Sequence, residues 1–231
     1  MNSLVLDLSV LVIFAVFIVM GFRSGVMRAF VMFVGAIFAS VFAGYCSGKV
    51  ADFVYQTFVS PSIESSVLKS ISESTLSFQT FCGNLPSLLC DALASYGITP
   101  SEFNHIISSS TESEIPARVA KLVEPAFTGV FKYIFSIFIF IILMLVVRLS
   151  SRFVLKLFKH KPINKANSLV GGFFGALKAY VVVAVSLCCI RALLPMMQNP
   201  PEMLSHESIS SSMVFKELYF KNPIYDMFQK M

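Results

Sequence analysis

The sequence carries little charge for its length. Charged residues make up 13% of the 231 positions, whereas a soluble domain has about 25%. Hydrophobic residues reach 56%, including 24 phenylalanines, and this balance predicts a membrane protein. The net charge is +5, but nucleic-acid binding would need a basic patch on a soluble, solvent-facing surface. We therefore expect no nucleic-acid partner.

The sequence also lacks the motifs of a catalytic or metal site. It has no paired carboxylates in a pocket, no nucleophile elbow and no loop that would cradle phosphate. His105, His160 and His206 are scattered over different segments, and no cluster of His, Cys, Asp and Glu has metal-ligand spacing. We therefore expect no enzyme activity, no cofactor and no metal.

Four stretches are long enough to cross a bilayer core, which takes roughly 20 helical residues. They cover residues 4–22, 26–46, 126–147 and 168–194. The first lacks the basic leader and cleavage site of a secretion signal, so we interpret it as a retained span. The predicted fold is an all-α polytopic membrane protein with four transmembrane helices and amphipathic helices in the long outer loop. Its parts are a hairpin at 1–48, a loop at 49–125, a hairpin at 126–194 and a tail at 195–231.

Basic residues in the two short loops predict the orientation, because such residues favour the cytoplasmic side. The first loop carries Arg23 and Arg28. The second carries Arg148, Arg152, Lys156, Lys159, Lys161 and Lys165. Both termini and the long loop then lie outside. The second cluster is interpreted mainly as an anchor on anionic headgroups of the lipid bilayer, with specific lipid recognition or a partner site as alternatives.

The long loop is rich in serine but contains short apolar periodicities typical of amphipathic helices. We expect these helices to lie on the membrane or on the outer ends of the spans, because the loop has too few strong apolar positions for a large core of its own. In this loop Cys82 and Cys90 are either a disulfide, which an oxidising compartment would allow, or two free thiols. The tail is expected to form one short surface helix around Val214–Tyr219.

Small residues form a stripe on two of the spans. Gly35, Ala39 and Ala43 recur every four residues on the second span, and Gly171, Gly175 and Ala179 do so on the fourth. This spacing lets helix backbones approach closely in lipid. The stripes therefore predict packing faces, either within one chain or between copies, with a ligand groove as the alternative.

Lys178 lies close to two helical turns after Gly171 and so projects from the same face. Burying its charge in a membrane costs about 2.5–3.5 kcal/mol on the insertion scale, which makes it a candidate functional residue. Three interpretations remain open. The lysine snorkels or bonds backbone carbonyls, it pairs with a carboxylate such as Asp7, or it lines a polar path.

Two segments carry a resemblance to a known family. "GFRSGVMRAFVMFVGAIFA" (21–39) and "VRLSSRFVLKLFKHKPINKANSLVGGFFGALKAYVVV" (147–183) resemble the opening hairpin and the basic loop with its glycine-rich span in the CvpA family, the colicin V production proteins. The matching positions are Gly21, Arg23, Gly25, Arg28, Gly171, Gly175 and Lys178. Ala29, Ala36 and Ala179 depart from the pattern. The resemblance implies a multi-pass protein of the bacterial inner membrane with a role in toxin production and envelope homeostasis.

Two functions from different classes follow. In the first, the chain is a non-catalytic membrane protein that assembles as a homo-oligomer through its small-residue faces and supports toxin production or export. In the second, an oligomer forms a channel or transporter for small solutes or anions, and Lys178 lines the path.

Overall fold

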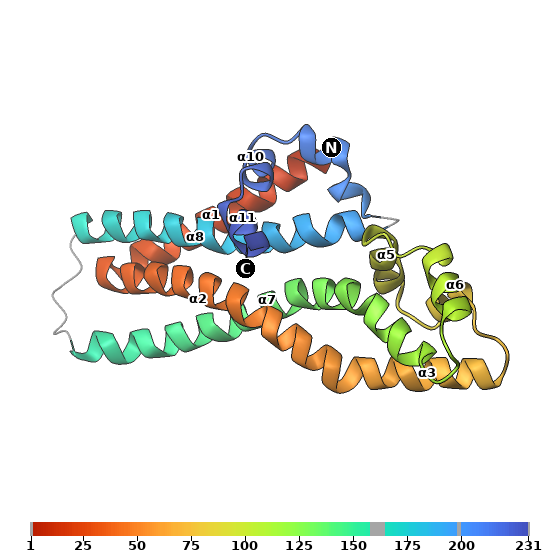
Figure 1. Ribbon diagram of the computed structural model, residues 1–231. Helices are drawn as coiled ribbons and strands as arrows, with labels where there is room; N and C mark the ends of the chain where they lie inside the picture. The colour runs from red at the N-terminus through yellow and green to blue at the C-terminus, as the bar shows by residue number, and fades with distance from the viewer. Residues whose placement is uncertain (1, 158–164, 198–199, 231) are drawn as a thin grey trace. The chain divides into compact units, whose positions relative to one another are not determined.

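The computed structural model describes residues 2–157, 165–197 and 200–230, and most of that backbone is helical, with no strand in these ranges (Figure 1). Four continuous helical segments are long and apolar enough to cross a membrane, namely Asn2–Ser24, Val26–Ser72, Ile115–Ser151 and Asn167–Met196. The predicted all-α fold with four transmembrane helices is confirmed. Each predicted span lies entirely within one of these segments.

The chain divides into two compact units. The first, the span unit, comprises Met1–Cys46, Ser136–Arg191 and Pro200–Met231, and the second, the loop unit, comprises Ser47–Phe135 and Ala192–Asn199. Three long helices contribute to both units, since α2 is Val26–Val54, α7 is Ile115–Leu157 and α8 is Lys165–Leu193. The loop unit begins two residues before the expected loop of 49–125 and its first segment ends ten residues after it.

The span unit contains α1 (Asn2–Ser24) and the greater parts of α2, α7 and α8. Only Gly25 separates α1 from α2, and its φ of +73° lies in the left-handed region that glycine enters without strain. Large apolar side chains on the outside of these helices are exposed, for example Phe38 at 71% and Phe173 at 62%. Such a surface is typical of helices that face lipid.

The loop unit is built from short helices between the ends of α2 and α7. They are a π-helical turn at Tyr55–Val59, α3 (Ser60–Ser72), α4 (Phe78–Gly83), α5 (Ser87–Ser95) and α6 (Pro100–Ser109). Thr99 begins α6 with a reciprocal capping box to Glu102, which satisfies amides at the helix end. The amphipathic helices expected in the long loop are present.

These helices enclose a hydrophobic core, contrary to the expectation that the loop cannot form one. Phe103 is fully buried and packs against Phe78 and Phe81, with ring centroids 5.6 and 5.4 Å apart. The expectation was wrong because α7 adds buried residues of the predicted third span, Ala126, Phe127 and Val130, to the same cluster. The loop thus completes its core with the first part of a helix that hydropathy had assigned to a span.

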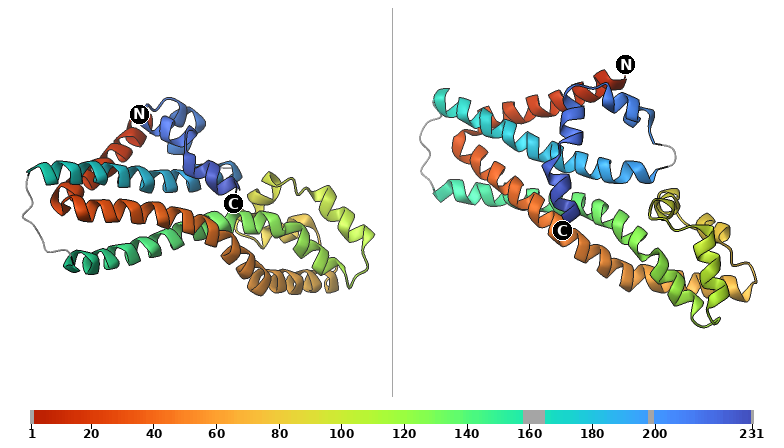
Figure 2. Two further views of the ribbon diagram at one scale, coloured as in Figure 1. Left: turned by 60° about the vertical axis from the view of Figure 1, so that its left-hand side comes forward. Right: turned by 45° about the horizontal axis from the view of Figure 1, so that its top comes forward.

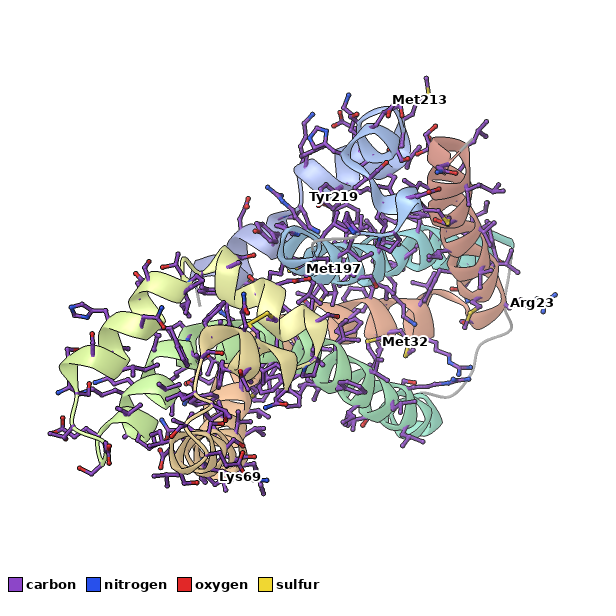
Figure 3. The ribbon with its side chains drawn as sticks, turned by 90° about the vertical axis from the view of Figure 1, so that its right-hand side faces the viewer. Arg23, Met32, Lys69, Met197, Met213 and Tyr219 are labelled. Atoms are coloured by element: carbon purple, nitrogen blue, oxygen red, sulfur yellow. A yellow bond between two sulfur atoms is a disulfide. The ribbon has the colours of Figure 1, made fainter. Side chains whose placement is uncertain are left out.

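Cys82 in α4 and Cys90 in α5 form a disulfide, with their Cα atoms 5.4 Å apart (Figure 3). Of the two sequence interpretations, the structure therefore has the bridge rather than the free thiols. The bridge closes the turn between α4 and α5 and fixes both helices against the core of the loop unit.

The tail forms three helices rather than the single one expected, namely α9 (His206–Ser210), α10 (Val214–Phe220) and α11 (Pro223–Lys230). They belong to the span unit. α9 and α10 lie beside the start of α1 in both views of Figure 2, whereas α11 lies farther along the bundle. Phe228 of α11 is fully buried against Gly44 of α2, where a Cβ would lie 2.8 Å from the ring. The sequence analysis predicted only one tail helix because polar residues interrupt the apolar pattern of α9 and α11.

Candidate functional site

Glycines bring α1 and α8 into backbone contact. A Cβ added to Gly171 would lie 2.6 Å from the carbonyl oxygen of Gly21, and one added to Gly175 would lie 3.2 Å from the Gly21 Cα. Real Cβ atoms do not approach other atoms as closely as 2.6 Å. Only glycine therefore fits at Gly171 without moving one helix away from the other, which is the use of small residues expected in lipid.

Two side chains from the start of α8 secure the turn between α1 and α2. The Ser168 hydroxyl donates a hydrogen bond to the Phe22 carbonyl at 2.7 Å, and the Asn167 amide oxygen accepts one from the Val26 backbone N–H at 3.0 Å. Groups at helix ends lack intrahelical partners, so these bonds satisfy atoms that would otherwise be exposed to an apolar medium. The two segments that carry the family resemblance thus meet in one junction, which we call the glycine junction.

A cationic cavity of about 60 Å³ opens beside the glycine junction. Three basic side chains from three helices line it: Arg28 of α2, Arg148 of α7 and Lys178 of α8. The other lining residues are Phe17, Met20, Gly21, Ser24, Ala29, Met32 and Gly175, and Met32 is labelled in Figure 3. None of the described residues around the cavity is acidic, so its wall carries a net positive charge.

Lys178 is the most deeply placed of the three cations, with only 8% of its surface exposed. Its Nζ atom lies 4.8 Å from the centroid of the Phe17 ring, which gives a cation–π contact. Of the three interpretations for this lysine, its place on the cavity wall agrees with a polar lining. The carboxylate proposed as its partner is engaged elsewhere.

That carboxylate, Asp7 of α1, binds the tail. Its Oδ2 accepts a hydrogen bond from the Met213 N–H at 2.8 Å, and its Oδ1 accepts bonds from the Val214 and Phe215 N–H groups, both at 2.9 Å. A carboxylate at the start of a helix satisfies free amides and complements the helix dipole. Asp7 therefore caps α10 and does not pair with Lys178.

Two further polar side chains, which the sequence analysis did not select, hold the tail on α8. Arg191 donates to the carbonyls of Tyr219 and Phe220 at 3.2 and 3.0 Å. The buried Asn222 side chain donates to the Ala184 carbonyl at 2.8 Å. Burial raises the pKa of the Tyr219 phenol in the same region. The Asn-Pro pair at the start of α11 was a readable helix-start signal, but nothing in the sequence pointed to its contact with α8.

The small-residue stripes make contacts inside the chain. Ala39 and Ala43 are buried in a cluster with Phe140 of α7 and Val185 of α8. Gly35 faces Val147 of α7. On α8, Gly171 and Gly175 face α1, and Ala179 is fully buried. The residues predicted as packing faces therefore meet other helices of the same chain.

The predicted basic surface is described only in part. Arg23 is exposed and points away from the helices, as Figure 3 shows, whereas Arg28 and Arg148 line the cavity. The side chains of Arg152, Lys156, Lys159, Lys161 and Lys165 lie outside the described residues. Arg28 and Arg148, which the sequence indicated as loop charges, thus also belong to the lysine's surroundings.

The loop unit contains a larger cavity of about 250 Å³. Apolar side chains and a row of serines on α3, formed by Ser62, Ser66 and Ser70, line it. Among the described residues, no group of three or more His, Cys, Asp or Glu side chains could hold a metal ion. The basic side chains around the smaller cavity make that cavity the stronger candidate site.

Residues 116–221 match a family model described as Colicin V production protein. The match covers most of α7, all of α8 and the tail through α10, and it includes Arg148, Gly171, Gly175 and Lys178. No characterised protein and no solved structure matches the chain.

Proposed function

We propose that the chain is a member of the colicin V production protein family, whose model residues 116–221 match, and that it is a non-catalytic protein of the bacterial inner membrane. In this proposal it supports the production or export of a protein toxin and contributes to envelope homeostasis. Its helices supply a rigid scaffold in the bilayer, and the loop unit supplies the surface on which envelope components act.

The glycine junction carries this proposal. Gly21, Phe22 and Val26 lie outside the residues that match the family model, yet they contact Gly171, Ser168 and Asn167 inside the matched segment. The N-terminal hairpin is therefore packed as a partner of the family domain. This supports extending the family architecture, and its membrane role, to the whole span unit.

The proposed orientation holds the two basic loops in the cytoplasm, with the loop unit and both termini outside. The positive-inside tendency of Lys and Arg supports it, as does the Cys82–Cys90 disulfide, because such bonds persist in oxidising compartments. Ser66→Cys in α3 and Ser150→Cys in α7, both at exposed positions, test it with a membrane-impermeant maleimide on intact cells.

We expect the reagent to label Ser66→Cys in intact cells and Ser150→Cys only after the inner membrane is permeabilised. The unsubstituted chain measures the background, since Cys188 and Cys189 are buried and Cys46 is half-buried. The opposite labelling pattern would reverse the orientation without affecting the family assignment.

A bacteriocin-producing strain that lacks its own colicin V production protein tests the function. Expression of this chain should restore toxin release, and Gly175→Leu should abolish the effect because the leucine would collide with the α1 backbone. Phe173→Leu, on the same helix but with 62% of the phenylalanine exposed, is the matched control and should restore release fully. Failure of the unsubstituted chain to restore release, despite normal membrane levels, would contradict the proposal.

The cationic cavity favours a second candidate function, an oligomeric channel or transporter for small anions. Because the small-residue stripes are engaged within the chain, copies in a homo-oligomer would meet through exposed apolar faces such as that of Phe38. Purified protein in liposomes should then conduct chloride, and Lys178→Met should reduce the flux. Flux no greater than in protein-free liposomes would eliminate this candidate.

A further inference from the structure

Among the residues that the structure describes, the wall of the cationic cavity includes no acidic side chain. In the part of the chain that the structure describes, no ion pair involves Arg28, Arg148 or Lys178. The carboxylate in the facing helix, Asp7, is occupied by the amides of α10. Three cations that share one small cavity repel one another, and burial strengthens this repulsion. An anion bound in the cavity would compensate the positive charges and replace this repulsion by attraction.

Lys178 has the geometry of a ligand-binding group rather than of a snorkelling one. Lys178 is 92% buried, and its ammonium group lies over the Phe17 ring. Within the described residues the ammonium makes no hydrogen bond, although it carries three donors. A cation–π contact replaces only part of the lost hydration, so the donors remain available to an acceptor in the cavity.

The size and position of the cavity limit the ligand. A volume of about 60 Å³ is far below the roughly 300–1,000 Å³ of a site for a drug-sized molecule, and it suits one small tetrahedral anion. Arg148 is exposed at the rim, and arginine forks match phosphate oxygens. The exposed Leu149 directly follows Arg148 in sequence, and the exposed Met20 lines the cavity, so acyl chains could contact both.

We propose that this cavity binds a phosphate group, held by Lys178 from within and by Arg28 and Arg148 from the sides. A phosphate of this kind is carried by an anionic phospholipid or is free in solution. The shared chemistry is one tetrahedral oxyanion with at least one negative charge. This inference does not depend on the role in toxin production, because it concerns the charge balance of the span unit alone.

Native mass spectrometry and thermal unfolding of the full chain in neutral detergent test the site. The probes are phosphatidylglycerol, phosphatidylethanolamine and sodium phosphate. Phosphatidylglycerol should bind more tightly than phosphatidylethanolamine and raise the unfolding temperature. Lys178→Met should weaken binding by roughly 10-fold or more, as expected for a lost hydrogen bond between charged groups. Arg23→Gln, which removes an exposed charge that does not line the cavity, should leave binding within about 2-fold.

The three probes separate the possible outcomes. Retention of phosphatidylglycerol that depends on Lys178, with no response to sodium phosphate, assigns the site to a lipid headgroup. A response to millimolar sodium phosphate in lipid-free detergent, also dependent on Lys178, assigns it to free phosphate. Equal losses for Lys178→Met and Arg23→Gln, or no binding of any probe, would overturn the proposal.

A second variant guards against misfolding as the cause of lost binding. Arg28→Gln changes a half-buried residue on another helix and should also weaken binding. In lipid-free detergent Lys178→Met should unfold at a higher temperature than the unsubstituted chain, because it removes an uncompensated charge. It should gain no further stability from phosphatidylglycerol. A variant that had simply lost its fold would unfold at a lower temperature under both conditions.

Discussion

Replacing Gly171 with alanine should destabilise the span unit through one added methyl group. The new Cβ would lie 2.6 Å from the Gly21 carbonyl oxygen and 3.3 Å from the Gly25 Cα. These are backbone atoms, which cannot rotate away as a side chain can. Restoring an ordinary contact of 3.4 Å would need α1 and α8 to separate by about 0.8 Å, and close-packed interiors resist such a shift. Overpacking of this kind costs about 1–3 kcal/mol.

Gly48→Ala provides the matched control. Gly48 also lies within a helix, α2, but a Cβ added there would meet no atom within 4 Å. Both substitutions gain up to about 1 kcal/mol from better helix propensity and a less flexible unfolded chain. The difference between the two variants therefore isolates the packing cost, and Gly171→Ala should be about 1–3 kcal/mol less stable than Gly48→Ala.

The assay is unfolding in mixed micelles with increasing dodecyl sulfate, followed by circular dichroism. The refuting result is agreement of the two variants within about 0.5 kcal/mol. That outcome would mean that α1 and α8 do not touch through their backbones, and the glycine junction would then lose its physical basis.

Three other substitutions test the contacts that hold the tail and the loop unit. Asp7→Asn places an amide nitrogen or a weaker acceptor opposite the α10 amides, so hydrogen exchange at Met213 should accelerate roughly tenfold, equivalent to about 1.4 kcal/mol. Asn222→Leu removes the bond to the Ala184 carbonyl and should speed tryptic cleavage in the tail, with an unchanged rate contradicting the anchor. Cys82→Ser opens a bridge between residues 8 apart in sequence and should lower the loop unit's unfolding free energy by about 2–3 kcal/mol in a thermal melt. Reductant should reproduce that loss in the unsubstituted chain, and no change in either case would contradict a stabilising bridge.

The spans and their small-residue faces could be predicted because each depends on local sequence. About 20 apolar residues define a span, and a repeat of four places Gly171 and Gly175 on one side of a helix. The identity of the facing helix could not be predicted this way. Gly21 lies 150 positions before Gly171, and nothing in the spacing of either motif specifies that the two backbones touch.

Long-range polar contacts explain the errors. Asp7 was considered as a partner for Lys178 because it was the one acidic residue within a predicted span. The structure instead pairs it with backbone amides of the tail. Free amides have no signature in a sequence, since every non-proline residue carries one. The sequence therefore shows that an acidic side chain in an apolar helix needs a partner, but it does not identify that partner.

Two arginines that the positive-inside tendency explains as loop charges also line the cationic cavity. Arg28 follows a short loop and Arg148 precedes one, so the positive-inside tendency alone accounts for both. The close approach of α1 and α8 at Gly175 brings Lys178 onto the same cavity wall as these arginines. Basic residues that only anchor a loop need no fixed geometry, and each could contact the lipid headgroups separately. Convergence of three cations from three helices is a stricter arrangement, and anchoring alone gives no reason for it.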